Sequence, residues 1–127
     1  MTREEKDLLI NDLCGRLSHG VKCKILETNE VKILAAIQYD GENTLFDFWE
    51  DDQKIQYGYQ LYLSEFKPYL LPLSSMTAEQ KTSHNFLKHS AYANPVKLID
   101  WYNKNHFDYR GLIPMGLAND ATNLNIY

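Results

Sequence analysis

The chain has 127 residues, of which 44% are hydrophobic and 24% are charged. This length and composition are typical of one globular domain, which we expect to span residues 1–127, and they exclude a mostly disordered chain. Thirteen basic residues face seventeen acidic residues, a net charge of −4. The chain therefore lacks the basic surplus that binding to duplex DNA requires.

No apolar run is long enough to span a membrane, and the first residues, MTREEKDLL, lack the apolar core of a secretory signal. We therefore expect a cytoplasmic protein without a membrane partner. The sequence carries no signal for a particular oligomeric state.

The first predicted element is an N-terminal helix. Thr2 and Glu5 have the spacing of a capping box, in which the hydroxyl and the carboxylate each accept a hydrogen bond from a backbone N–H. Leu9, Leu13 and Leu17 then recur at helical spacing and form one apolar stripe.

The chain has two cysteines, Cys14 and Cys23. They are too few for a disulfide framework and lack the C-x-x-C spacing of a metal or redox motif. Cys14 falls in the predicted helix and Cys23 in the segment that follows it. We expect both to be buried as small apolar side chains.

Four segments alternate apolar and polar residues, the period of a half-buried strand: residues 21–26, 31–39, 44–49 and 54–63. Loops of about four residues join them, which predicts a four-stranded antiparallel meander. An unbroken period of two would place one set of apolar residues on the face that packs against helices. This set is Val21, Cys23, Ile25, Ile33, Ala35 and Ile37.

Beyond the meander, Pro68 and Pro72 exclude a continuous helix, and residues 69–73 are expected to cross the core as a short extended stretch. A second capping-box pattern predicts a helix over residues 78–89. An Asn-Pro pair at residues 94–95, an N-cap and first helical position, predicts another helix. The predicted fold class is therefore α+β: an N-terminal helix, a four-stranded antiparallel meander, and two or three C-terminal helices packing on one sheet face.

Three segments resemble one known family: MTREEKDLLINDLCGRL at the start, FKPYLLPLSSMTAEQK in the middle and WYNKNHFDYRGLIPMGLA near the end. The family consists of small uncharacterised proteins that are abundant in gut Bacteroidales genomes and in their mobile elements or phages. The resemblance implies a bacterial cytoplasmic setting. The family offers no activity, cofactor or catalytic residue to carry over to this chain.

The sequence is unusual in combining acidic and aromatic residues within the predicted sheet. Residues 40–53 contain six acidic residues and no Lys or Arg. Solvated turns and cross-strand aromatic pairs would account for this pattern, but tyrosine-rich, lysine-poor surfaces also suit protein interfaces. We therefore predict a non-catalytic protein-binding or regulatory module whose partner is another protein. The candidate contact residues are Trp49, Tyr57, Tyr59, Tyr62, Asp51 and Asp52.

Two alternative functions stay open from the sequence alone. A small enzyme with a dispersed active site would use Asp47, His106 and Asp108, and a deep polar pocket around them would support it. A single-stranded nucleic-acid binder would stack bases on the aromatic sheet face, where the nearby acids would repel phosphates. Glycine-rich phosphate loops, nucleophile elbows and metal-ligand spacings do not occur in the sequence, so no cofactor and no metal are expected.

Residues 105–118, NHFDYRGLIPMGLA, predict a structural clasp. Gly111 suits a turn and Pro114 prevents a long helix, yet the segment is too apolar for an exposed loop. Asp108 and Arg110 are expected to bind backbone or each other at its rim. The residues expected to close over the core are Phe107, Tyr109, Leu112, Ile113, Met115 and Leu117.

Overall fold

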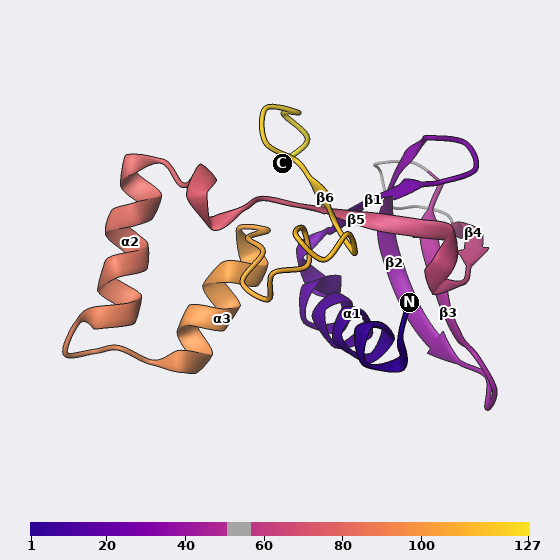
Figure 1. Ribbon diagram of the computed structural model, residues 1–127, viewed down its shortest axis with the longest axis horizontal. Coiled ribbons are helices and arrows are strands. Elements are labelled where there is room, and N and C mark those ends of the chain that lie inside the picture. Colours follow the sequence, from indigo (N-terminus) through magenta and orange to yellow (C-terminus); the bar gives the residue numbers. More distant parts are fainter. Residues whose placement is uncertain (51–56) are drawn as a thin grey trace.

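The computed structural model describes residues 1–50 and 57–127, and Figure 1 shows their arrangement. Within these residues the chain forms three α-helices and a mixed sheet of six strands. The helices are α1 (Arg3–Arg16), α2 (Ala78–His89) and α3 (Pro95–Lys104). The strands are β1 (Lys22–Ile25), β2 (Val31–Tyr39), β3 (Thr44–Trp49), β4 (Tyr57–Leu61), β5 (Phe66–Leu70) and β6 (Asn119–Asp120). The short 3₁₀ turns are η1 (Leu17–His19), η2 (Leu63–Glu65) and η3 (Leu73–Ser75).

The α+β class is confirmed, but the sheet is larger than predicted. Its order is β4-β3-β2-β1-β5-β6 over the part of the chain that the structure describes. The first four strands are antiparallel neighbours in chain order. β5 then pairs antiparallel with β1, and β6 pairs parallel with β5. The four-stranded meander is therefore one part of a mixed sheet.

β5 contains Pro68 and still pairs with β1. Proline fits a strand where its missing N–H would have no partner. The backbone N–H of Leu26 donates to the carbonyl of Glu65 (3.0 Å), and the alternation of an antiparallel ladder then turns the nitrogen of Pro68 away from β1. On the other side, β6 begins to pair one residue later. The stretch expected at residues 69–73 therefore starts three residues earlier, as β5.

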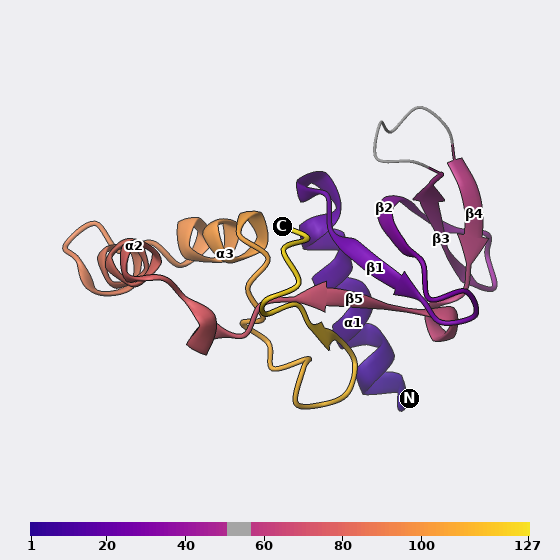
Figure 2. The same ribbon diagram turned by 90° about the horizontal axis from the view of Figure 1, so that it is seen from above.

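α1 covers one face of the sheet, lying against β1 and β5 (Figures 1 and 2). The predicted capping box is formed at its N-terminus. Leu9 and Leu13 are buried in the core that α1 shares with the sheet. In that core Phe46 and Phe48 meet the ring of Phe66 edge-on, with centroids 5.1 and 4.9 Å apart.

α2 and α3 do not pack on a sheet face, contrary to the prediction. They form a hairpin that extends from one end of the molecule, with α2 farthest from the sheet (Figures 1 and 2). α2 has no buried residue, whereas α3 buries Tyr102 and Asn103. The amide of Asn103 lies 3.0 Å from where a Cβ on Gly15 of α1 would be. α3 therefore joins the hairpin to α1 through a close contact that needs the glycine.

A β-bulge in β2 changes which of its residues reach the core. The register against β3 shifts between Leu34 and Ala36. Leu34 belongs to the core under α1, in the place expected for Ile33. Ile33 is also buried but lies outside that core cluster, and Ala35 at the bulge is half-buried. The extra residue shifts the alternation by one, so Ile37 packs against the core as predicted. The predicted positions in and beside β1 are confirmed as buried: Val21, Cys23 and Ile25.

The two cysteines have different environments. Cys23 is buried in β1 as predicted, and burial raises the pKa of its thiol. Cys14 is exposed on α1, so the prediction of burial is wrong for this residue. It follows the buried Leu13, and one residue turns an α-helix by about 100°.

Residues 105–118 close over the core as predicted. Phe107 and Leu112 are fully buried. The carboxylate of Asp108 accepts hydrogen bonds from two backbone N–H groups of the turn that follows it, at 2.8 and 2.9 Å. Met115 is exposed, so the prediction fails at that position. Asp108 therefore has a structural role in holding the turn.

A buried ion pair joins α1 to this clasp. Asp12 and Arg16 are both 0% exposed, and Arg16 Nε lies 2.7 Å from Asp12 Oδ2. Arg16 Nη2 also donates to the carbonyl oxygen of Phe107 (2.6 Å). Arg110 pairs with the same aspartate, Nε to Oδ1 at 3.2 Å, and not with Asp108. Two guanidinium groups therefore compensate the burial of one carboxylate.

Arg16→Met should lower the free energy of unfolding by about 3–5 kcal/mol, because it leaves the Asp12 carboxylate buried without its main partner. Arg110→Met should cost less than about 1 kcal/mol, since the Arg110 side chain is 32% exposed. Urea unfolding followed by circular dichroism measures both. Equal losses in the two variants would contradict the central role of Arg16.

His106 packs the clasp against the C-terminal residue. Its backbone φ is 63°, and its ring stacks on Tyr127 with centroids 3.6 Å apart. Burial, followed by the positive charge of Arg16, lowers the pKa of His106 to about 4. The Tyr127 hydroxyl accepts from the backbone N–H of Lys22 and donates to the carbonyl of Tyr69, both at 2.8 Å. The C-terminal residues are thus tied to β1 and β5.

The lowered pKa of His106 predicts pH-dependent stability. An unfolded chain protonates this histidine near pH 6.5, and the folded chain only near pH 4. Stability present above pH 6.5 should therefore be lost as the pH falls from 6.5 to 4. The loss is on the order of 2 kcal/mol after discounting for partial exposure.

His106→Asn removes the titrating group and keeps a residue that tolerates positive φ. Its unfolding free energy should change less between pH 7.5 and pH 4.5 than that of the wild type. His89→Asn, at an exposed histidine, should keep the wild-type dependence. An unaltered pH dependence in His106→Asn would show that other groups cause it.

Candidate binding surface on the helical hairpin

Two N-caps define the hairpin. Thr77 Oγ1 accepts from the backbone N–H of Gln80 (3.2 Å), whose side chain accepts in return from the N–H of Thr77 (2.8 Å). Asn94 Oδ1 accepts from the N–H groups of Val96 and Lys97, and a proline takes the first helical position of α3. Both helices therefore begin where the sequence predicts.

Stacked aromatic rings fix α3 to the clasp. Trp101 stacks on Phe107 and Tyr102 on Tyr109, with centroids 5.4 and 5.2 Å apart. These rings belong to an apolar cluster distinct from the core under α1. The Arg16 guanidinium lies 5.3 Å from the centroid of the Tyr109 ring. The hairpin is thus attached through α3 to the buried ion pair.

α2 is held to α3 partly through His84. His84 Nε2 forms a hydrogen bond with the Tyr102 hydroxyl (2.6 Å), and its ring lies 5.9 Å from that of Trp101. Burial, then the positive charges of Lys88 and His89, lowers the pKa of His84. The imidazole is therefore neutral at pH 7, and one ring nitrogen can accept a hydrogen bond.

An open groove of about 450 Å³ lies between the two helices. It is lined by Thr82, Ser83, Phe86, Leu87 and Trp101. Thr82 and Phe86 are one turn apart, as are Ser83 and Leu87, so these four residues share one face of α2. Phe86 is 57% exposed, and the groove volume falls within the range of roughly 300–1,000 Å³ typical of ligand pockets.

The charges around this groove are uneven. Lys97 and Lys104 are both exposed. Lys97 lies about one turn before Trp101 and Lys104 about one turn after it, so helical spacing places all three on one stripe of α3. Glu79 lies one turn before the groove-lining serine of α2. Residues 78–104 contain four lysines and two acidic residues, a net charge of +2 in a chain of −4.

Of the contact residues predicted on the sheet, the structure describes the side chains of two, Trp49 and Tyr62. Trp49 is half-buried at the end of β3, and its backbone pairs with that of Tyr57 in β4. Tyr62 follows the other end of β4, about 16 Å along the strand, and is 52% exposed. Tyr59 pairs with Phe48 between them.

Two of the predicted contact residues, Asp51 and Asp52, lie outside the residues that the structure describes, as do the side chains of Tyr57 and Tyr59. Phe46 and Phe48, which contribute to the aromatic density of this region, are fully buried. Their rings pack in the core and offer no face to a nucleic-acid base or a protein partner.

The structure does not bring together Asp47, His106 and Asp108. The carboxylate of Asp47 accepts hydrogen bonds from the side chains of Gln38 and Gln60, the latter at 3.0 Å, and is nearly buried. The other two residues lie in the clasp beside β5. Two strands separate β5 from β3, a distance of about 14 Å.

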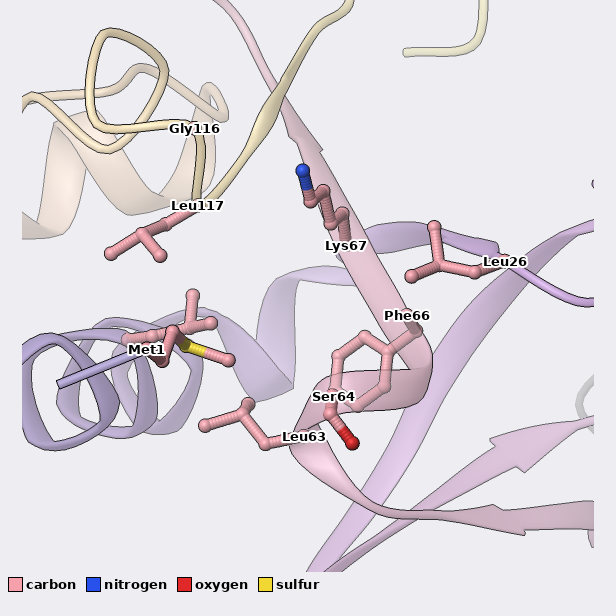
Figure 3. A pocket seen from close by; sticks show the side chains of 9 residues that line it. Met1, Leu26, Leu63, Ser64, Phe66, Lys67, Gly116 and Leu117 are labelled. Carbon is pink, nitrogen blue, oxygen red and sulfur yellow. The ribbon is translucent and has the colours of Figure 1, made fainter. Parts of the chain in front are cut away.

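A second cavity, of about 230 Å³, lies beside α1, η2 and the clasp. Figure 3 shows the apolar side chains of Met1, Leu63, Phe66 and Leu117 around it, with Lys67 nearby. This volume is below the range of roughly 300–1,000 Å³ usual for small-molecule sites. We assign the cavity to imperfect packing between these elements.

Within residues 1–50 and 57–127, no group of three or more His, Cys, Asp or Glu side chains could hold a metal ion. Of the helices in the same residues, none has the length and apolar character needed to cross a membrane. No family model, curated protein or solved structure matches the chain.

The groove on the hairpin was not singled out from the sequence. Two signals were present in the sequence. The helix over residues 78–89 has only Phe86 and Leu87 as large apolar residues, too few for a helix that covers a sheet. The second signal is the spacing of Lys97, Trp101 and Lys104, which places a lysine one turn away on each side of an aromatic residue, with Asp100 between them.

The exposed Phe86 of the hairpin should contribute little to the free energy of unfolding, whereas Phe107, on which the hairpin rests, should contribute much. Phe107→Ala should lower the free energy of unfolding by about 3–5 kcal/mol, because it empties a fully buried site. Phe86→Ala should change it by less than about 0.5 kcal/mol, since the side chain is largely exposed. Thermal and urea unfolding measure both. A large loss in Phe86→Ala would mean that this side chain packs in the fold and is not available to a partner.

Proposed function

We propose that this protein is a non-catalytic protein-binding module and that the α2–α3 hairpin contacts its partner. The observation that carries the proposal is that α2 buries none of its residues, yet presents an exposed phenylalanine beside a groove lined by Trp101. A helix of 12 residues is marginal in water without a packed apolar face. Aromatic residues in such a position are typical anchors of protein interfaces.

The aromatic base of the hairpin supports this proposal. Stacking of Trp101 on Phe107 fixes one wall of the groove before any partner binds. Pre-ordering a contact surface lowers the entropic cost of association. The resemblance to a Bacteroidales family adds a bacterial cytoplasmic setting to the same proposal.

The acidic and aromatic sheet surface is a second candidate contact surface. Tyr62 borders a groove of about 230 Å³ whose lining includes Glu42 and Lys6. Tyr62 is half-exposed, so its aromatic ring is available to a partner in this region. The two surfaces lie on different elements, so single substitutions can separate them.

The test is affinity capture from an extract of the bacterium that encodes the chain, with quantitative mass spectrometry. Phe86→Glu should reduce the captured partner at least tenfold, because it places a charge in the groove. Tyr62→Glu, a matched change at an exposed aromatic residue, should leave capture unchanged. Circular dichroism should first confirm that both variants are folded.

The opposite result, loss only with Tyr62→Glu, would move the interface to the sheet. Capture that neither substitution reduces would overturn both surfaces.

A further inference from the structure

We infer that the groove of the hairpin binds a single amphipathic α-helix about three turns long, with acidic side chains along the edge that lies against α3. This inference rests on the proposed protein-binding function and specifies the chemistry of the partner.

The size of the hairpin limits what can cover it. α2 has 12 residues and α3 has 10, so at about 1.5 Å per residue they are roughly 18 and 15 Å long, and each is about 10 Å wide. The face that the two helices offer is therefore on the order of 300–400 Å². A stable interface between folded domains needs about 800 Å² from each partner. The hairpin face is too small for this, but it matches the footprint of one short helix.

The groove has the chemistry of a helix-in-groove site. Phe86, Leu87 and Trp101 provide apolar walls, and an incoming helix would fill the space with side chains spaced three or four residues apart. The hydroxyl of Thr82 already donates to the carbonyl of Ala78 within α2. The polar rim therefore needs little from the partner, and apolar contact is the main source of affinity.

The charges beside the groove favour a negatively charged partner. Lys97 and Lys104 lie on either side of Trp101 along α3, and the one acidic residue between them, Asp100, leaves this stripe with a net positive charge. Lys81 and Lys88 lie on the opposite side of α2 from Phe86 by the same spacing rule. A helix with Asp or Glu on its α3-facing edge would pair with Lys97 and Lys104, whereas a basic helix would be repelled.

The test uses a display library of randomised peptides of about 15 residues, selected on the immobilised wild-type chain and counter-selected on Phe86→Glu. Selected peptides are synthesised, labelled and titrated by fluorescence anisotropy. We expect enrichment of helix-forming sequences with apolar residues at i, i+4 and i+7 and a net negative charge. Their affinity should fall when salt is raised, because exposed charge pairs are screened.

A pair of double variants tests the assignment of the lysines. Lys97→Glu with Lys104→Glu should weaken the selected peptides at least tenfold, the effect expected of two reversed rim charges. Lys81→Glu with Lys88→Glu makes the same change in net charge on the other side of the hairpin and should alter affinity less than about twofold. Equal effects of the two pairs would overturn the inference, because they would reflect net charge alone.

The possible failures can be told apart. Enrichment of basic, neutral or non-helical peptides that depend on Phe86 would overturn the inference and leave the protein-binding function in place. A library that yields no Phe86-dependent peptide would overturn both. Sedimentation velocity on the free chain tests whether a second copy of the chain fills the groove. Self-association that Phe86→Glu abolishes would show this, and the inference would be wrong.

Discussion

The buried ion pair between Asp12 and Arg16 is the contact on which the arrangement of the other elements depends. Arg16 binds the carbonyl of Phe107 and lies against the ring of Tyr109, so one guanidinium joins α1 to the clasp. The clasp then supports Trp101 and Tyr102 through stacking, and these residues carry the hairpin. A charge this deep is tolerated only when good hydrogen bonds and an opposite charge offset its loss of water, which Asp12 and the Phe107 carbonyl provide for Arg16. The position of the hairpin relative to the sheet is therefore set from inside the molecule.

Local signals in the sequence predicted most of the helices and strands, but they predicted little of how these elements pack against one another. Capping residues at Thr77 and Asn94 fixed the starts of both C-terminal helices, because a cap acts within one turn. The period-two rule found four strands, but it failed across the bulge at Ala35, since an inserted residue leaves no mark in the alternation. β5 was underestimated because Pro68 argues against a strand unless its neighbours are known. Where the helices pack depends on contacts between distant residues, which local patterns do not contain.

The candidate site shows the same division. The aromatic residues near the middle of the chain suggested a surface, yet Phe46, Phe48 and Phe66 pack on one another beneath α1. Asp12 and Arg16 have the i, i+4 spacing of an ordinary surface pair. The pair is buried because the segment that contains Phe107 packs over it, and this contact between distant residues is not visible in the local sequence. The exposure of Phe86 likewise follows from where α3 is anchored. The clasp, by contrast, could be predicted, because its combination of turn residues and apolar residues is itself a local pattern.

The hydrogen bond from Arg16 to Phe107 also bears on how the chain is made. It joins residues 91 positions apart, and at about 5–20 residues per second the ribosome needs roughly 5–18 seconds to synthesise that interval. During this time Asp12 and Arg16 stay in water, and Leu9 and Leu13 have only part of their core. Contacts so distant in sequence form late in folding. A chain that stops before Phe107 therefore lacks the carbonyl that Arg16 binds, so the clasp can cover the ion pair of α1 only after synthesis has passed this residue.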